Sequence, residues 1–260
     1  MISGIGSRVL ALGEYVVDLL AATTSAVLRG LNPRYWKRLI RQAFSEQVVA
    51  CGLKMIVLVV LLAVIIGSSL IVQLQIWVTR IGQSHMIGSL LVIVVLREIA
   101  PLVVNLMLIG RSGSAMTAEL ASMRLAGEVR VLEAQGIDPF LYLVVPRVLG
   151  LAVSGLFLTL LFVLVCLSSG YFIGQFTEAR TGGIFEFSGD VIGGLTLSDL
   201  LNLLAKSMFI PLLIGTTLCN EGLGVASPRE LPAAIRRGLT QAVLIAFIAS
   251  SCVSLLIYSI

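Results

Sequence analysis

Residues 55–79, MIVLVVLLAVIIGSSLIVQLQIWVT, contain no Asp, Glu, Lys or Arg. A helix crosses the hydrocarbon core of a bilayer with about 20 apolar residues, so this stretch is long enough to do so. Residues 148–177 and 239–260 are equally uncharged. The whole chain of 260 residues is 58% hydrophobic and only 12% charged, whereas soluble domains have ~25% charged residues. The sequence therefore predicts an all-α integral membrane protein.

Five membrane-spanning helices are predicted when the same length criterion is applied and isolated charges are tolerated. If the N-terminus is cytoplasmic, fourteen of the eighteen Lys and Arg residues fall in cytoplasmic segments, and only Arg80 and Arg180 fall in outer loops. Basic residues concentrate on the cytoplasmic side of membrane proteins, so this bias predicts a cytoplasmic N-terminus and an outer C-terminus. It also explains the net charge of +4 without nucleic acid. The expected spans cover residues 53–72, 86–110, 148–174, 200–218 and 239–258.

The loop between the third and fourth predicted spans, residues 175–199, differs from the cytoplasmic segments in its charge. It is rich in glycine and acidic residues, which is typical of an outer loop under the same rule. The acidic residues are Glu178, Glu186, Asp190 and Asp199.

The first fifty residues precede the first span and have the pattern of an amphipathic helix. Apolar residues recur at helical spacing between Val9 and Val27, and charged residues occupy the other side. We expect residues 1–50 to form cytoplasmic or interfacial amphipathic helices, and residues 51–260 to form a single transmembrane domain. A cleavable signal sequence is not expected in this segment.

The second predicted span carries two adjacent charges, Arg97 and Glu98, in an apolar segment. A charged side chain at the centre of a membrane helix costs about 2.5–3.5 kcal/mol on insertion, and such residues face a bundle interior or a wet cavity. Pro101 removes the N–H that would bond to the carbonyl of Arg97, so a kink is expected there. Asn105, seven residues after Glu98, is expected on the same helix face.

The fourth predicted span repeats this pattern with Lys206 and a second expected kink at Pro211. Two interpretations are open. Lys206 with Glu98, or Arg97 with another acceptor, forms an interhelical ion pair that only fixes the packing. Alternatively, the charges mark a path for an amphiphile with a charged head group. The residues of that path would be Arg97, Glu98, Asn105 and Lys206.

The segment after the second span, Gly110–Glu119, is rich in small residues that let helices approach closely. Neither this segment nor the rest of the chain contains the G-x-x-x-x-G-K-[ST] phosphate loop, so ATP binding by that motif is not expected. From Thr117 to Gly136 the pattern is that of an amphipathic helix, with Gly136 and Pro139 as stop signals. This helix would rest on the membrane surface or on a soluble partner.

These motifs resemble the MlaE family, the permease subunits of lipid-transporting ABC systems. The resemblance covers residues 96–139 closely, and the five-span layout extends it over nearly the whole chain. It is carried by Leu96-Arg97-Glu98-Ile99-Ala100-Pro101, Gly110–Leu120, Met123-Arg124, Glu128 and Gly136-Ile137-Asp138-Pro139.

The resemblance implies a permease subunit in the bacterial inner membrane that moves phospholipid or a similar lipid and is not an enzyme. ATP and Mg would be bound by a separate ATPase dimer, so no cofactor is expected in this chain. The other implied partners are a second permease copy, in a homodimer or heterodimer, an MCE-protein ring on the outer side and, in some members, a STAS-domain protein. The family's Arg-Glu pair falls on Arg97 and Glu98. The implied coupling helix, about residues 118–136, would contact the ATPase through Glu119, Leu120, Met123, Arg124, Glu128 and Leu132.

Two other classes of function stay open. A membrane-embedded lipid-modifying enzyme would need a nucleophile with a base, or a metal cluster. The single histidine, His85, stands alone at an outer boundary, and the four cysteines lack metal-ligand spacing, so no catalytic or metal site is predicted. A non-transporting membrane scaffold would need neither, and would be distinguished from a permease by the absence of bound lipid.

Overall fold

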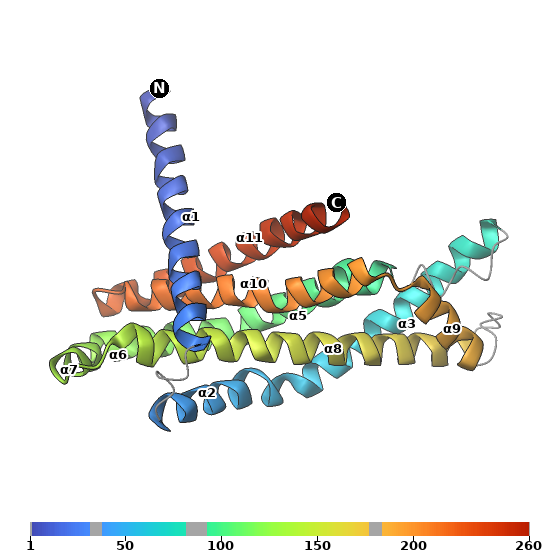
Figure 1. Ribbon diagram of the computed structural model, residues 1–260, viewed down its shortest axis with the longest axis horizontal. Coiled ribbons are helices and arrows are strands. Elements are labelled where there is room, and N and C mark those ends of the chain that lie inside the picture. The colour runs from blue at the N-terminus through green and yellow to red at the C-terminus, as the bar shows by residue number, and fades with distance from the viewer. Residues whose placement is uncertain (1, 32–37, 82–92, 177–183, 260) are drawn as a thin grey trace.

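The computed structural model describes residues 2–31, 38–81, 93–176 and 184–259, and every regular element among them is a helix (Figure 1). Five helical segments in these ranges are long and apolar enough to cross a membrane. This confirms the predicted all-α membrane protein with five spans. The five segments are Ile40–Leu74, Val95–Leu125, Phe140–Gln175, Leu197–Leu223 and Pro228–Tyr258.

Helix α1 (Ile2–Leu31) crosses the bundle instead of running along it, and its N-terminus projects away from the other helices (Figure 1). Leu19 and Thr23, one helical turn apart, are both buried against the bundle. The hydroxyl oxygen of Thr23 lies 2.9 Å from that of Thr216, which ties α1 to helix α10 (Leu197–Leu223). A buried polar contact therefore fixes the crossing point.

The apolar face predicted for α1 is divided between two environments. Leu19 and Thr23 are buried, whereas the neighbouring Val16 and Leu20 are 46% and 44% exposed. The outward apolar side chains, together with the crossing direction, give this helix the geometry of an interfacial helix. Its position at a membrane surface stays a prediction.

The first span is longer than expected because two helices are joined end to end. Helix α2 (Arg38–Cys51) leads through a single 3₁₀ turn, Leu53–Met55, into α3 (Ile56–Ile81). The apolar segment begins at Ile40, before residue 51, where we expected the transmembrane domain to begin. Both α2 and α3 pack along α8 (Val145–Phe176).

Small residues let these helices approach closely. A Cβ atom at Gly67 of α3 would collide with the main-chain carbonyl of Cys166 on α8. A Cβ atom at Gly155 of α8 would lie 2.8 Å from the ring of Pro211, which sits inside α10. Close backbone approach at small residues is the usual basis of helix packing in membranes, where no hydrophobic force drives association.

Helix α11 (Leu231–Tyr258) follows a short 3₁₀ turn, Pro228–Glu230, and packs along α10. Its buried residues are small and lie four positions apart, which forms one stripe along the helix. The stripe consists of Ala234, Gly238, Ala242, Ala246 and Ser250.

The second span is a continuous helical stretch that contains two π turns. A π turn, with i to i+5 hydrogen bonds, adds a residue to the turn and shifts the faces of the residues that follow. The elements are the π turn Val95–Ile99, α5 (Ala100–Met107), the π turn Leu108–Gly113 and α6 (Ser114–Leu125).

The single coupling helix expected at residues 118–136 is wrong, because the structure divides it in two. Helix α6 ends at Leu125, and α7 (Glu128–Ala134) begins after Gly127, which has φ of +81°. That left-handed conformation interrupts helical hydrogen bonding and is accessible mainly to glycine. A second left-handed glycine, Gly136, follows α7 before the π turn Phe140–Val144 leads into α8.

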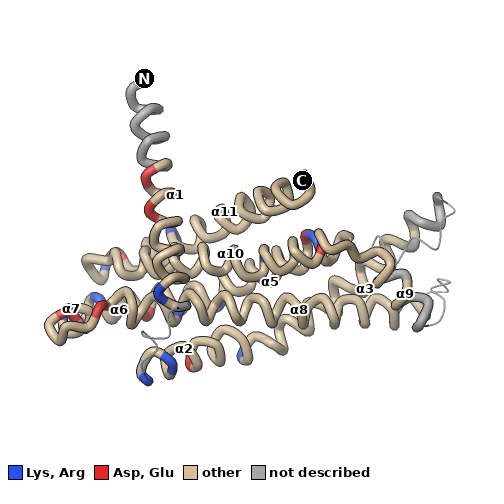
Figure 2. Tube along the Cα trace, in the orientation of Figure 1, with Lys and Arg blue, Asp and Glu red and all other residues tan. Residues whose placement is uncertain are grey.

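The bundle has two ends, which we call the α7 end and the α9 end after the helices found there (Figure 1). Helix α9 (Ile184–Gly194) lies beside the C-terminal part of α8. Most of the charged residues gather towards the α7 end, and the middle of the bundle is almost uncharged (Figure 2). The orientation expected from the positive-inside rule, with the α7 end in the cytoplasm, stays a prediction. A separate small group of charges lies nearer the α9 end (Figure 2).

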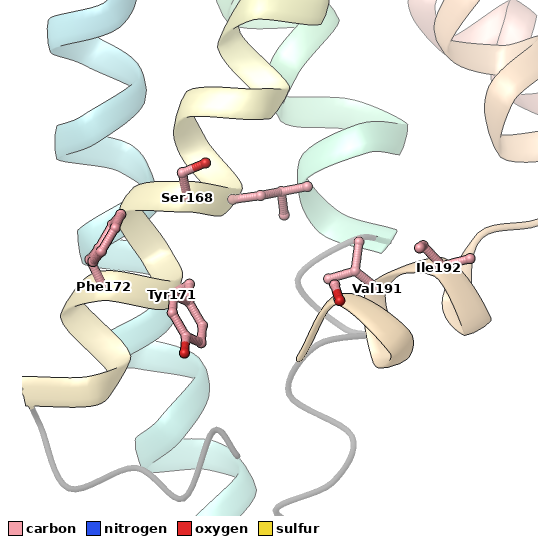
Figure 3. Close-up of a pocket in the computed structure, with 7 residues that line it drawn as sticks. Ser168, Tyr171, Phe172, Val191 and Ile192 are labelled. Carbon is pink, nitrogen blue, oxygen red and sulfur yellow. The ribbon is translucent and has the colours of Figure 1, made fainter. Parts of the chain in front are cut away.

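The α9 end also has an apolar recess between α8 and α9, with a volume of about 220 Å³ (Figure 3). Tyr171 and Phe172 contribute from α8, and Val191 and Ile192 from α9. No charged side chain is among its described lining residues. The recess is therefore suited to apolar groups and is separate from the charge cluster described next.

Candidate functional site

Arg97 forms an ion pair with Asp199, a residue that we expected in the outer loop. The guanidinium Nε lies 2.6 Å from a carboxylate oxygen of Asp199. Arg97 belongs to the π turn before α5, and Asp199 to the first turn of α10. The Asp199 side chain is fully buried, whereas that of Arg97 is 29% exposed. The Arg97 side chain is therefore partly exposed, while the carboxylate that holds it is buried.

Lys206 forms the second ion pair, with Glu98. The ammonium Nζ lies 2.8 Å from a carboxylate oxygen of Glu98. The exposures are the reverse of the first pair, because the Lys206 side chain is fully buried and the Glu98 side chain is 55% exposed. The two pairs lie together, since Arg97 and Glu98 are adjacent and Asp199 and Lys206 are on one helix.

The carbonyl of Arg97 joins the two ion pairs. In an α-helix this carbonyl would accept the N–H of residue 101, but Pro101 has none. Here it accepts hydrogen bonds from Lys206 Nζ at 2.8 Å and from the Asn202 side-chain amide at 3.2 Å. Buried carbonyls in membrane proteins need such replacement donors. The proline and the buried lysine thus form one structural unit.

Two hydroxyl groups of α11 complete the cluster. Ser254 donates to Glu98 Oε1 at 2.6 Å, and Tyr258 donates to Asp199 Oδ1 at 2.7 Å. The guanidinium carbon of Arg97 also lies 4.6 Å from the centre of the Tyr258 ring, which is the geometry of a cation–π contact. Ser254 and Tyr258 are one turn apart, so α11 contributes one hydroxyl to each ion pair.

The charges of this cluster balance, with two cations and two carboxylates. The interpretation as interhelical ion pairs is therefore supported by the geometry for both pairs. The path interpretation rests on the exposed parts, which belong to Arg97 and Glu98. The described contacts of the Arg97 side chain are made by its Nε, at Asp199, and by the face of the guanidinium, at Tyr258. The two terminal nitrogens are the atoms that bind a phosphate in bidentate geometry.

Two other residues were singled out from the sequence, Asn105 on the predicted path and Pro211 at a predicted kink. Asn105 is buried on α5, with 2% exposure, whereas the Glu98 side chain is 55% exposed. The π turn Val95–Ile99 contains Glu98 and departs from the 3.6-residue period on which the expected common face rests. The common face stays a prediction. Pro211 lies inside α10 against Gly155, away from the ion pairs.

Asp199 illustrates a signal that sequence reasoning missed. Thr196 and Asp199 form a capping box, in which Thr196 Oγ1 accepts the N–H of Asp199 and the Asp199 carboxylate accepts the N–H of Thr196. The pattern Thr-x-x-Asp before an apolar run is a sequence signature of a helix start. It would have placed Asp199 in the first turn of the fourth span. The pairing with Arg97 could not be read from that pattern.

At the α7 end, the residues predicted to couple to an ATPase divide into buried and exposed groups. Leu120 is fully buried, and Met123 and Leu132 are partly buried against the core. Arg124 and Glu128 are exposed. Glu119 lies 3.0 Å from Arg147 of α8, so it ties α6 to the bundle. The exposed surface of α6 and α7 is therefore smaller than the predicted set.

A hollow of about 410 Å³ separates α6 and α7 from the start of α8. Glu128 and Val131 lie at this hollow, and Tyr142 lines it from the π turn that leads into α8. Val131, which we did not single out, is 55% exposed. His85 and residues 86–92 of the second predicted span lie outside the described residues.

Comparison with known proteins identifies the family. The chain is 27% identical over 195 residues to the intermembrane phospholipid transport system permease protein MlaE of Haemophilus influenzae, which covers 71% of this chain and 75% of that protein. It is 30% identical over 186 residues to a probable ABC transporter permease protein of Synechocystis, covering 72% of this chain and 70% of that one.

A plant protein is also similar. Protein TRIGALACTOSYLDIACYLGLYCEROL 1, chloroplastic, of Arabidopsis thaliana is 27% identical over 198 residues, which is 76% of this chain but 55% of the plant protein. This chain thus spans about half the length of that relative. The model of the family described as Permease MlaE matches residues 44–260. With most of its length matched, this membrane protein belongs to the MlaE permease family.

Proposed function

We propose that this chain is the transmembrane subunit of an ABC transporter that moves phospholipid, or a similar lipid, between the inner membrane and a ring of MCE-domain proteins. A separate ATPase dimer supplies the energy, and this chain carries out no catalysis. Membership of the MlaE family supports the proposal. So do the names of the relatives, one of which belongs to an intermembrane phospholipid transport system and others to ABC transporters.

The observation that carries the proposal is the partly exposed guanidinium of Arg97 in a membrane span. Its Nε is held by buried Asp199, and its face by Tyr258, so the side chain has a fixed direction. Its terminal nitrogens are available to a lipid phosphate. An ordered, desolvated cation of this kind is what recognition of a charged head group within a membrane requires.

Lys206 then has a different role from the one expected. Its ammonium is fully buried and donates to Glu98 and to the Arg97 carbonyl, so it does not reach a substrate in this state. Lys206 instead positions the helix segment that carries Arg97. Glu98 keeps the net charge of the cluster near zero and repels a second anion, which favours release of the lipid after it has moved.

The α7 end is proposed as the ATPase contact. Helices α6 and α7 present Arg124, Glu128 and Val131 outward beside the hollow in front of Tyr142. Because Glu119 is paired with Arg147, a displacement of α6 would be transmitted directly to α8. ATP binding in the partner could in this way change the relative stability of two permease states.

A second permease copy and the outer MCE ring are also proposed partners. A STAS-domain protein bound through the ATPase is the last proposed partner. The outermost spans support contact with a second copy and with lipid. Within the chain, only 17% of the Pro228–Tyr258 window and 28% of the Ile40–Leu74 window are buried. We place the N-terminus in the cytoplasm and the C-terminus on the outer side, on the basis of the basic α7 end.

The test is lipid transfer by the complete transporter in reconstituted vesicles. Replacing Arg97 by Ala should lower the transfer rate at least about tenfold, because a charge-assisted hydrogen-bond pair to phosphate is lost. The ATPase subunits should still co-purify. Replacing Arg236, an exposed cation of α11, by Gln is the matched control and should leave transfer unchanged.

The same variants separate the two interpretations of the cluster. If R97A lowers the thermal stability but transfers lipid at the wild-type rate, the cluster only fixes helix packing and the proposed substrate path is wrong. If R97A folds normally, retains its ATPase and fails to transfer lipid, Arg97 acts on the substrate.

A further inference from the structure

A second site with a positive charge lies between the first and second spans. A cavity of about 220 Å³ separates the junction of α2 and α3 from the second π turn of the second span and the start of α6. Lys54 reaches it from the 3₁₀ turn between α2 and α3, and Arg111 from the π turn before α6. Two cations that are distant in sequence therefore meet at one cavity.

Neither cation has an acidic partner among the described residues. The ion pairs in that part of the chain use Arg29, Arg97, Arg147, Lys206 and Arg237 as cations. Lys54 and Arg111 are exposed instead. Glu119 also lines the cavity, but its carboxylate is 3.0 Å from Arg147 and is thereby neutralised. The cavity has a net positive charge that nothing described here balances.

The other lining groups suit an oxyanion with an apolar attachment. Gln47 donates its side-chain amide to the sulfur atoms of Cys51 and Met116, at 3.0 and 3.7 Å. Sulfur is a weak acceptor, so little is lost if this amide turns to a phosphate oxygen. The remaining wall is apolar or small, and includes Ala50 and Ala115.

The surface next to Lys54 continues as an apolar helix face. Val57, Leu58 and Leu61 follow Lys54 by three, four and seven residues, so they share its side of the helix. They are 78%, 39% and 54% exposed. A head group at Lys54 would thus have its acyl chains directly against α3. The cavity is smaller than the ~300–1,000 Å³ of pockets that enclose a drug-sized ligand, so it would hold a head group alone.

We propose that this cavity binds the phosphate of an anionic phospholipid, with Lys54 and Arg111 as its ligands. The site is distinct from the Arg97 cluster, because Arg111 follows Arg97 by fourteen residues, or about 21 Å along a helix. In the orientation proposed above, it lies on the cytoplasmic side of the Arg97 cluster. The chain then holds two phosphate sites at different depths along its second span.

The occupant is identified by charge and by the apolar face together. A soluble phosphate would use the two cations but would gain nothing from Val57 and Leu61. A neutral lipid would use the apolar face but would leave the cations without a counter-charge. Only an anionic lipid satisfies both, because oxyanions are bound by Lys and Arg and the chains bury apolar surface.

The test uses the purified full-length chain in a neutral detergent. Bound dioleoyl phosphatidylglycerol is counted by native mass spectrometry, and its affinity is followed by the shift in thermal unfolding. We expect the K54Q/R111Q variant to lose one bound lipid per chain and to bind at least about tenfold more weakly at this site. The R130Q/R236Q variant removes the same charge from exposed cations outside the cavity and should bind as the wild type does.

Two further probes identify the source of the phosphate. Dioleoyl glycerol has the same chains without the phosphate and should not occupy the site. Inorganic phosphate should compete only weakly. If inorganic phosphate binds as tightly as the lipid, or if K54Q/R111Q keeps the full lipid count, the proposal is overturned.

A protein contact is the remaining alternative, and it has its own signature. If K54Q/R111Q binds lipid normally but no longer retains the ATPase, the two cations serve a protein partner and the lipid site is excluded. The binding assay needs neither transport nor Arg97, so R97A should keep this lipid. The lipid-binding assay and the transport assay therefore distinguish a failure of this site from a failure of the proposed transport function.

Discussion

The ammonium of Lys206 lies 2.8 Å from the main-chain carbonyl of Arg97, at the helix position where Pro101 offers no N–H. One buried side chain thus replaces a missing backbone hydrogen bond and also neutralises Glu98. Its removal would leave two acceptors short of a donor at once. Asn202 and Ser254 would remain as the other donors to the carbonyl and the carboxylate.

Replacing Lys206 by Met should therefore lower the free energy of unfolding by about 1–3 kcal/mol, because the charged hydrogen bonds from its ammonium to the Arg97 carbonyl and to Glu98 are both lost. Thermal unfolding in detergent measures the change. The R130Q variant, which removes an exposed cation, should unfold at the wild-type temperature. An unchanged midpoint in Lys206→Met would show that Asn202 and Ser254 are sufficient.

Tyr258 makes two contacts that two substitutions separate. Tyr258→Phe removes the hydrogen bond to Asp199 but keeps the ring over Arg97, and should cost about 1 kcal/mol. Tyr258→Ala also removes the cation–π contact, worth about 0.5–2 kcal/mol more. We expect lipid transfer to fall in the same order, because Arg97 becomes progressively freer. Equal transfer rates in both variants would mean that the ring does not position Arg97.

Gly127 separates α6 from α7 with φ of +81°. Gly127→Ala should destabilise the chain by about 1–2 kcal/mol, because an L-residue is strained in the left-handed region although space is available for its Cβ. Gly110 also has open space around it but has no positive φ, so Gly110→Ala should be neutral or slightly stabilising. Differential scanning calorimetry of the two variants measures this contrast. Equal unfolding temperatures for the two variants would show that the break at Gly127 has no structural role.

Glu128 and Glu133 are both exposed acids of α7, but only Glu128 lies at the hollow in front of Tyr142. Replacing Glu128 by Lys should weaken association with the ATPase at least about fivefold, because a cation then occupies a position where the proposed contact has an anion. Glu133→Lys is the matched control and should co-purify normally. If both variants retain the ATPase equally, α7 is not its contact.

The spans were predictable from the sequence because length and hydropathy are local properties of each segment. The charged pair at Arg97 and Glu98 and the buried Lys206 were predictable for the same reason, since a charge in an apolar segment must find a partner. The partners of these charged residues were harder to predict from the sequence. Asp199, Ser254 and Tyr258 become important only through the packing of α10 and α11 against the second span, which depends on three helices at once.

The division of the coupling segment at Gly127 was missed for a different reason. Apolar residues keep their helical period on both sides of the break, so the pattern alone indicates one helix. A glycine within such a pattern is compatible with both a helix and a left-handed turn. Here the turn is favoured because α7 must fold back towards the start of α8, which is a tertiary requirement.

The ion pairs of the charge cluster join residues that lie far apart in the sequence and are therefore synthesised at different times. Lys206 follows Glu98 by 108 residues, so at a synthesis rate of ~5–20 residues/s the second span waits about 5–20 s for its partner. During that interval Arg97 and Glu98 lack the countercharges that they have in the folded structure. The second span therefore completes its ion pairs only after the fourth span has been made. Assembly of this protein in the membrane is thus governed by the order in which its charges arrive.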